Sequence, residues 1–167
     1  GIKGEKEFSA RGISYCAVCD GAFFEGKPVA VIGGGDTALS DALYLSQMCE
    51  KVYIIHRREN FRGNETLQEK VKNTENIELI LNAVLVEFVG DKLLNAVKYV
   101  QNGEEKLLSV SGSFTAIGSI PGTELVRGIV ALDDNGYIKA GEDGITSAKG
   151  IFAAGDVRTK QLRQVVT

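Results

Sequence analysis

The most constraining feature of the sequence is the run PVAVIGGGDTA at residues 28–38, in which an apolar stretch leads directly into three glycines. Residues 28–32 are continuously apolar and rich in β-branched side chains, as is typical of a strand buried on both faces of a parallel sheet. Residues 37–49 then carry apolar side chains at helical spacing, and KVYII at 51–55 repeats the buried-strand pattern. This order predicts a βαβ unit within an α/β fold.

The glycine run matches the GxGxxG/A pattern of dinucleotide-binding turns, with Ala38 at the third small position. Gly33 would make the tight turn, Gly35 would let a pyrophosphate approach the backbone, and Ala38 would let the helix pack closely on the strand. The helix N-terminus would offer free N–H groups to the phosphates. The motif alone is weak evidence, because an ordinary strand-to-helix turn can carry the same glycines.

A second signal follows the strand-like run at 51–55, where His56, Arg57 and Arg58 stand in sequence. An NAD-binding protein carries an acidic residue near this position to hold the ribose hydroxyls. Guanidinium groups would instead bind a 2′-phosphate through charge-assisted hydrogen bonds of roughly 1.5–3 kcal/mol each. Since about 1.4 kcal/mol is tenfold in affinity, these arginines, with Arg62 nearby, favour NADPH over NADH. The alternative is a solvated basic patch, and His56 could simply end a strand.

The rest of the chain adds a short helix and several strands. NETLQEKVKN at 64–73 predicts a polar helix, and strand-like runs begin at Ile77. GD at 90–91 and NG at 102–103 mark tight turns between the last three of these runs, as hairpins require. Three later segments read as a return strand, a hairpin turn and a buried strand: 113–118, 133–138 and 150–157. We therefore predict an α/β fold, a three-layer, Rossmann-like nucleotide-binding domain with an antiparallel β-meander.

A pair of thiols precedes the glycine run: Cys16 and Cys19 are two residues apart, and Asp20 follows directly. This CxxC spacing lets a disulfide open and close without rearranging the fold, and a helical or turn conformation after Cys16 would lower the pKa of a thiol. The adjacent carboxyl group could give a proton to a leaving thiolate. A redox pair is favoured, with metal binding and incidental buried thiols as the alternatives.

A zinc site would need about four ligands, and the other candidates are Cys49 and His56. They flank the run at 51–55, and extended steps of about 3.3 Å would hold them on the order of 20 Å apart. We therefore predict no metal site in this chain, and expect Cys49 to be a structural or semi-exposed thiol.

The totals exclude other classes of function. A net charge of −3 argues against general attraction to nucleic acid, and no apolar run of about 18 residues is present to span a membrane. Three cysteines are too few for a secreted disulfide framework, which favours a cytoplasmic protein. Because the sequence begins with Gly1 rather than Met and ends in an apolar QVVT, we expect it to be a piece of a longer protein.

In their order along the chain, the motifs YCAVCDG, VIGGGDTA, IIHRRENFR, AIGSIPGT and GIFAAGDV followed by RQ closely resemble the low-molecular-weight thioredoxin reductases. In that family an NADPH domain that carries the CxxC is inserted into a split FAD domain. The resemblance implies that residues 1–9 end the first FAD-domain segment, that 10–118 form the NADPH domain, and that 119–167 are an incomplete second FAD-domain segment. By itself, the chain is then expected to bind NADPH but not to turn over.

The resemblance also implies residue roles. Cys19 would face the flavin, Cys16 would exchange with thioredoxin or a thioredoxin-like protein, and Asp20 would protonate the dithiol or flavin system. The residues expected to hold NADPH are the glycine turn and the basic segment: Gly33, Gly34, Gly35, Asp36, Thr37, Ala38, His56, Arg57, Arg58 and Arg62. Further cofactor contacts are expected at Ile117, Gly118, Asp156, Arg163 and Gln164, the last three to FAD.

Departures from the family pattern are mild: Thr37 stands where Ser is frequent, Gly63 where Ala is usual, and Val165 where Ala is expected. Members of the family are usually homodimers, whereas this piece could be a monomer. Three alternatives remain open: the same domain of an alkyl hydroperoxide reductase flavoprotein, a nonenzymatic NADP(H)-binding redox sensor, and, more remotely, a structural metal-binding domain.

Overall fold

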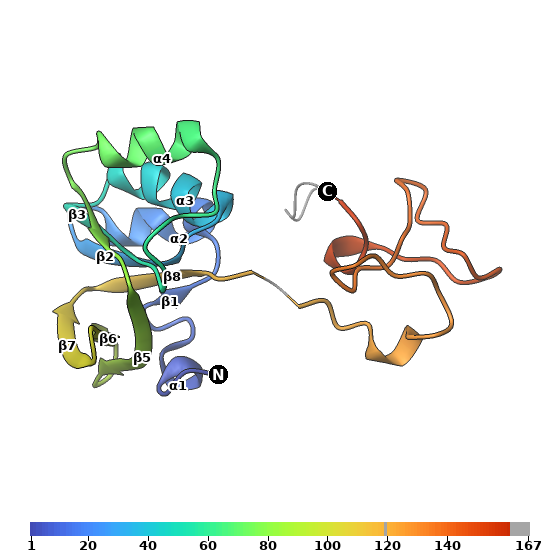
Figure 1. The fold of residues 1–167 in the computed structure, drawn as a ribbon. Helices are drawn as coiled ribbons and strands as arrows, with labels where there is room; N and C mark the ends of the chain where they lie inside the picture. The colour runs from blue at the N-terminus through green and yellow to red at the C-terminus, as the bar shows by residue number, and fades with distance from the viewer. Residues whose placement is uncertain (119, 161–167) are drawn as a thin grey trace. The chain divides into compact units, whose positions relative to one another are not determined.

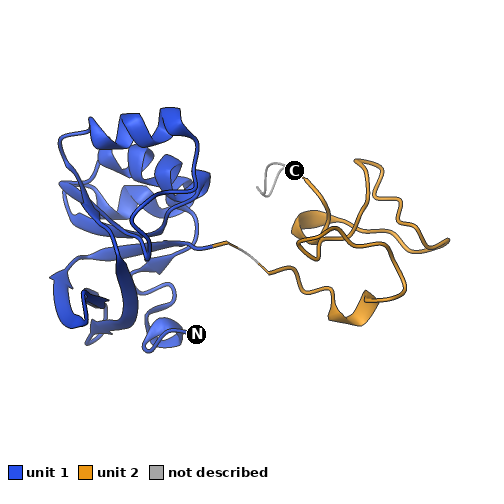
Figure 2. Cartoon of the chain, viewed as in Figure 1, with its two compact units in different colours: residues 1–117 blue, residues 118–167 orange. Residues whose placement is uncertain are grey.

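The structure is a computed structural model that describes residues 1–118 and 120–160. The chain divides into two compact units, the first of residues 1–117 and the second of residues 118–167 (Figure 2). Within the described residues no helix is long and apolar enough to cross a membrane.

The first unit is built on a parallel five-stranded sheet in the order β1-β8-β2-β3-β4 (Figure 1). The strands are β1 (Ile13–Ser14), β8 (Gly112–Ala116), β2 (Pro28–Gly33), β3 (Lys51–Ile55) and β4 (Ile77–Ile80). The predicted strands at 28–32 and 51–55 are confirmed. Strand β2 lies at the centre, and its Val29, Ala30 and Val31 are fully buried, as expected for a strand covered on both faces.

Helices cover one face of this sheet: α2 (Ala17–Asp20), α3 (Asp36–Ser46) and α4 (Glu65–Lys72), with the 3₁₀ turn η1 (Gly21–Phe24) after α2 (Figure 1). Helix α3 ends three residues earlier than predicted, and its buried side chains recur at helical spacing, at Ala38, Leu39, Ala42 and Leu45. Helix α4 starts where the Asn64 side chain accepts the N–H of Thr66 at 2.8 Å.

An antiparallel meander covers the other face, formed by β5 (Ala83–Gly90), β6 (Leu94–Gln101) and β7 (Glu104–Ser109). The predicted NG turn is confirmed between β6 and β7, where Asn102 and Gly103 both have positive φ, as a tight hairpin requires. Side chains of the meander such as Phe88 and Val97 pack with Ile32 of β2 in one core cluster. The first unit is therefore the predicted three-layer α/β fold.

The N-terminal segment also packs in the first unit. The short helix α1 (Glu5–Phe8) buries Phe8 in the core cluster of the meander, and the N–H of Phe88 donates to the carbonyl oxygen of Lys3 at 2.9 Å. The Lys3 ammonium pairs with the Glu87 carboxylate at 2.7 Å. Residues 1–9 thus pack as part of the first unit.

The second unit has a small core of Val130, Ile138 and Ala153, with 3₁₀ turns η2 (Glu124–Val126) and η3 (Gly155–Val157). The predicted hairpin turn is confirmed by the antiparallel bridge between Leu132 and Ile138. The prediction of a buried strand over 150–157 is wrong. Within the described residues this segment pairs with Ile145 at the Phe152 bridge and with the Ile138 N–H through the Val157 carbonyl oxygen at 2.9 Å. Phe152 is 70% exposed, so these isolated contacts do not make a buried strand.

The partly buried Asp41 carboxyl group on α3 allows the packing of the helix layer to be tested. Burial raises the pKa of its carboxyl group from 3.8 to about 6. This pKa is higher in the folded than in the unfolded state, so ionisation of Asp41 destabilises the fold. The contribution of the protonated group to the unfolding free energy is fully present below about pH 3.8 and is lost as the pH rises through about 6. Asp41→Asn should therefore raise the unfolding free energy at pH 8 by about 1 kcal/mol, a value reduced for the partial solvent exposure. Urea unfolding at pH 8 and pH 3.5 checks this, since the gain should vanish at the lower pH.

Candidate active site

The predicted site segments follow the carboxyl ends of four strands. Since β1, β8, β2 and β3 are parallel, these ends lie along one edge of the sheet. The CxxC segment follows β1, Ile117 follows β8, the glycine turn follows β2, and His56 follows β3. From β2 the chain continues to β3 on one side of β2, whereas β8 lies on the other side. The switch point of the sheet is therefore at β2, beside the glycine turn. Ligands of such sheets bind in that crevice.

Cys16 and Cys19 form a disulfide with their Cα atoms 5.3 Å apart. Cys16 occupies the N-cap position of α2, and its Sγ accepts the N–H of Cys19 at 3.2 Å. Cys19 is exposed and Cys16 is half-buried. After reduction, the same N–H would favour the thiolate form of Cys16, as a helix N-terminus does for reactive cysteines. The chain after Cys16 is helical, which is one of the two conformations expected to favour the thiolate.

The Asp20 carboxylate lies beside the disulfide on the same short helix. It accepts a hydrogen bond from the Ser14 hydroxyl at 2.6 Å, and that hydroxyl oxygen in turn accepts the N–H of Cys16 at 3.1 Å. Ser14 is only 5% exposed. A buried hydroxyl therefore links the candidate acid to the backbone of the redox pair. Sequence reasoning missed Ser14, because a serine at a strand end carries no signal of its own.

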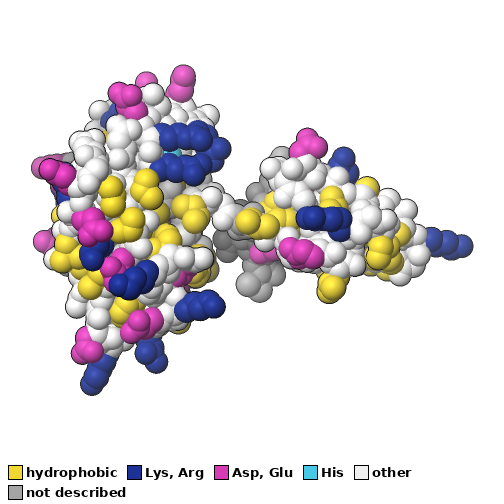
Figure 3. Space-filling model, turned by 60° about the horizontal axis from the view of Figure 1, so that its bottom comes forward, with side chains coloured by type: hydrophobic (Ala, Val, Ile, Leu, Met, Phe, Trp, Pro, Cys, Tyr) yellow, Lys and Arg dark blue, Asp and Glu magenta, His cyan; other side chains and the backbone are white. Residues whose placement is uncertain are grey.

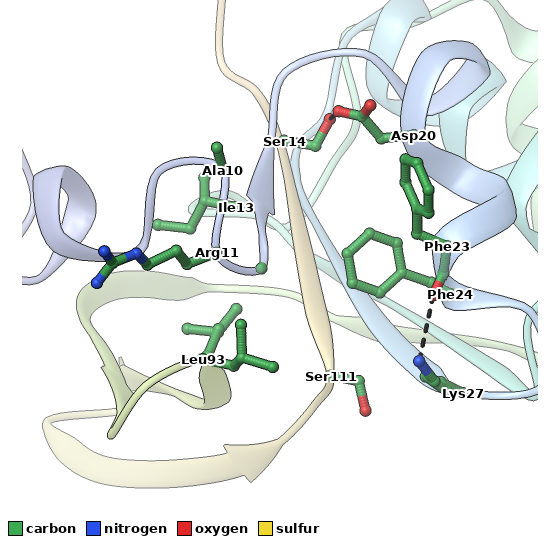
Figure 4. A pocket seen from close by; sticks show the side chains of 12 residues that line it. Ala10, Arg11, Ile13, Ser14, Asp20, Phe23, Phe24, Lys27, Leu93 and Ser111 are labelled. Atoms are coloured by element: carbon green, nitrogen blue, oxygen red, sulfur yellow. Dashed lines mark hydrogen bonds between the residues drawn. The ribbon is translucent and has the colours of Figure 1, made fainter.

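A pocket of about 520 Å³ opens between the CxxC segment and the meander (Figure 4). Phe23 and Phe24 line one side, Leu93 lies across from them, and the side chains of Arg11 and Lys27 reach its rim. The Phe23 ring is 74% exposed, and the Lys27 ammonium donates to the Phe23 carbonyl oxygen at 3.2 Å. The sequence offers one signal for this pocket, the phenylalanine pair at 23–24 after CDGA, which a buried core would also explain.

The three glycines of the turn have different surroundings. Gly33 has φ of 149°, and a Cβ there would overlap the carbonyl oxygen of Ala116. A Cβ on Gly34 would overlap the imidazole ring of His56. A Cβ on Gly35 would meet nothing within 4 Å. The first two glycines therefore allow the close packing of the fold, and Gly35 leaves open space where a phosphate can approach the backbone.

This difference predicts opposite results for two matched substitutions. Gly33→Ala should lower the unfolding free energy by about 3 kcal/mol, because it adds backbone strain to a steric overlap. Gly35→Ala should change stability by less than about 1 kcal/mol, yet weaken NADPH binding by about tenfold or more, because the methyl group fills the phosphate's space. Urea unfolding and calorimetric titration measure the two effects. Equal destabilisation by both variants would contradict this reading.

The His56 side chain packs against the glycine turn at Gly34. It is 6% exposed, and its ring packs on Phe61 with the centroids 5.3 Å apart. Burial lowers the pKa of His56, and the positive charges of nearby Arg58, Arg57 and Arg62 lower it further, against a backbone hydrogen bond that raises it. The neutral ring then donates from Nε2 to the carbonyl oxygen of Asn60 at 3.2 Å.

The residues between β3 and α4, numbers 56–64, form what we call the basic loop. Its Arg57, Arg58 and Arg62 are exposed, and Figure 3 shows dark-blue cationic side chains gathered beside the cyan histidine. The N–H groups of Arg62 and Gly63 both donate to the carbonyl oxygen of Gly34, at 2.8 and 3.2 Å. The structure therefore holds the cationic segment against the glycine turn, as a site for a phosphorylated dinucleotide requires.

At the N-terminus of α3, the first intrahelical N–H bond runs from Leu39 to the Gly35 carbonyl oxygen at 3.1 Å, so the preceding N–H groups point out of the helix end. Thr37 is exposed there and Ala38 is buried against the sheet. Asp36 is exposed, but its carboxylate accepts the N–H of Asn64 at 2.6 Å. The helix end thus offers donors to an anion.

The other predicted contacts are more distant in the chain. Ile117 follows β8, the strand that pairs with β2 beside the glycine turn, and it is 64% exposed. Gly118 and Asp156 belong to the second unit, and the Asp156 carboxylate pairs with the Lys160 ammonium at 2.8 Å. Arg163 and Gln164 lie outside the described residues.

The described part of the chain contains no group of three or more His, Cys, Asp or Glu residues placed to hold a metal ion. Cys49 is 4% exposed, and burial raises the pKa of its thiol to about 11. It therefore stays protonated and unreactive at neutral pH.

Comparison with known proteins gives one consistent family. The thioredoxin reductase of Listeria monocytogenes is 44% identical over 170 residues, which cover 100% of this chain and 53% of that protein. Thioredoxin reductase 1 of Saccharomyces cerevisiae is 44% identical over 172 residues, covering 99% of this chain and 54% of the relative. The crystal structure of the Streptococcus pyogenes thioredoxin reductase matches with a TM-score of 0.89 at 38% identity, covering 100% of this chain and 56% of that chain.

The chain thus spans about half the length of the curated relatives it matches. Residues 1–167 match the family described as pyridine nucleotide-disulphide oxidoreductase. The match agrees with the CxxC disulfide and with the glycine turn at the switch point of the parallel sheet. The chain belongs to the pyridine nucleotide-disulphide oxidoreductase family, and its relatives over the whole length are thioredoxin reductases.

Proposed function

We propose that this chain is the NADPH-binding and redox-disulfide part of a flavin-dependent thioredoxin reductase. The observation that carries the proposal is that a disulfide and a dinucleotide-type glycine turn follow two parallel strands, β1 and β2, at one edge of one sheet, with β8 between them. Residues 10–118 would then be the NADPH domain. Residues 1–9 and 119–167 would belong to an FAD domain that other polypeptide completes, and the whole protein would be a cytoplasmic homodimer.

The residues present fit NADPH. Open space at Gly35 and the outward N–H groups of α3 would take the pyrophosphate, and Arg57, Arg58 and Arg62 would take the 2′-phosphate. FAD, when bound, supplies the chemistry that converts a hydride into the two electrons a disulfide accepts. Asp156 in the second unit, with Arg163 and Gln164, would contribute to its site.

Within this proposal, the CxxC segment carries electrons to a protein disulfide. The reduced pair would pass them on by thiol–disulfide exchange, with Cys16 as the attacking thiolate. Asp20, held by the Ser14 hydroxyl, would supply the proton that a leaving thiolate takes up. The exposed apolar side chains around the disulfide, at Tyr15, Val18 and Phe23, suit a docked protein such as thioredoxin better than a small molecule.

The proposal is tested by titrating the chain with NADPH and with NADH, and by assaying NADPH-dependent reduction of thioredoxin. We expect preferential binding of NADPH and slow or no turnover without an added flavoprotein. If the chain binds neither dinucleotide, its assignment as an NADPH domain is wrong. Rapid turnover by the chain alone would show that no separate flavin site is needed.

A further inference from the structure

The basic loop is attached to the glycine turn by three hydrogen bonds. Two run from the N–H groups of Arg62 and Gly63 to the Gly34 carbonyl oxygen, at 2.8 and 3.2 Å. The third runs from the N–H of Asn64 to the Asp36 carboxylate and is the shortest, at 2.6 Å. It is also the only one of the three made by a side chain, and it joins residues 28 positions apart.

The other end of the loop is attached elsewhere. The N–H of Ala83 donates to the carbonyl oxygen of His56 at 3.0 Å, and the N–H of Asn82 donates to that of Arg58 at 3.2 Å. The first and third positions of the loop are thereby fixed by residues 82 and 83, at the start of the meander. Near the far end, the N–H groups of Arg62 and Gly63 are held by the glycine turn, and the N–H of Asn64 is held by Asp36. The Gly63 carbonyl oxygen also accepts the Gln68 side chain at 2.7 Å.

From these contacts we infer that Asp36 is a positioning residue for cofactor selection, which holds Arg62 in place and does not contact the dinucleotide itself. The inference rests on the proposed NADPH site. Coulomb repulsion makes a direct contact between a carboxylate and a phosphate unfavourable, whereas a carboxylate that accepts a backbone N–H forms a strong, charge-assisted hydrogen bond. Asp36 would thus act through the loop, by keeping a guanidinium group ready for the 2′-phosphate.

The test compares Asp36→Ala with Asp36→Asn, which keeps an acceptor oxygen. The measured quantity is selectivity, the ratio of the NADH to the NADPH dissociation constant. Asp36→Ala should lower it about tenfold, the change expected when one charge-assisted contact is lost, and Asp36→Asn should largely preserve it. In an Arg62→Ala background, Asp36→Ala should lower selectivity no further, because the two residues act as one unit.

Three results would overturn the inference. Equal weakening of NADPH and NADH would mean that Asp36 contacts the part that both share. Tighter binding by both variants would mean that the carboxylate only repels the phosphates. Additive effects of the Asp36 and Arg62 substitutions would mean that they act separately.

Amide hydrogen exchange separates this inference from the proposed function. Asp36→Ala, but not Asp36→Asn, should speed exchange at residues 62–64 in the free chain. If the parent chain binds neither dinucleotide, the proposed function fails, and exchange alone decides whether Asp36 holds the loop. Equal exchange in the parent and Asp36→Ala would overturn that role.

Discussion

Replacing Cys16 with serine should abolish electron transfer from the reduced chain to thioredoxin, while replacing Cys19 should trap a covalent complex. Under the proposed function, the Cys16 thiolate of the intact pair would attack one sulfur of the thioredoxin disulfide, forming a mixed disulfide and releasing a thioredoxin thiolate. Cys19 would then attack the Cys16 sulfur, which would restore the disulfide and release the second thiolate. Without Cys19 the second step cannot occur, so the mixed disulfide can decay only by return attack of the released thioredoxin thiolate, and blocking that thiolate with N-ethylmaleimide should preserve the adduct.

The measurement uses chain reduced with dithiothreitol, freed of reductant and mixed with oxidised thioredoxin. Non-reducing gels should show an adduct for Cys19→Ser and none for Cys16→Ser, and the parent should reduce up to one thioredoxin disulfide per chain. Cys49→Ser is the control, since this buried thiol has a raised pKa and should leave transfer unchanged. An adduct through Cys19 in the Cys16→Ser variant would reverse the assigned roles.

The layers of the first unit were predictable because local pattern and tertiary environment agree there. Residues 28–32 and 52–55 are apolar, and both segments lie in strands covered on two faces. The Asn102–Gly103 turn was predictable because few other residues accept positive φ at both positions. Strand order was less accessible, since only tertiary contacts place β8 between β1 and β2.

The segment 150–157 shows where such reasoning fails. Its composition is that of a buried strand, but a strand forms only where a neighbour offers backbone partners along its length, and within the described second unit this segment finds only isolated ones. Asp36 shows a similar limit at the site. Its place in the glycine motif suggests a cofactor contact, whereas its hydrogen bond to Asn64 depends on how a loop 28 residues later folds back.

Removing two guanidinium groups from the basic loop should also have a large effect. Arg57→Ala combined with Arg58→Ala should remove most of the preference for NADPH over NADH. Each guanidinium contact with the 2′-phosphate is worth roughly 1.5–3 kcal/mol. Both side chains are exposed, so we take the lower figure for each, and the selectivity ratio should fall about 100-fold. NADH affinity should change less than about twofold, because NADH has no phosphate at that position. Calorimetric titration of both dinucleotides measures the ratio.

The control is Lys70→Ala combined with Lys72→Ala, which removes the same charge from exposed positions in the last turn of α4. A general effect of net charge would weaken NADPH binding equally in both double variants and would disappear at high salt, where exposed charges are screened beyond roughly 3–10 Å. A specific clamp predicts instead that only the arginine variant loses selectivity, and that part of the loss persists at 0.5 M salt, because hydrogen bonds in contact are screened least. If the arginine variant binds NADPH as tightly as the parent, the basic loop is a solvated surface and the phosphate is recognised elsewhere.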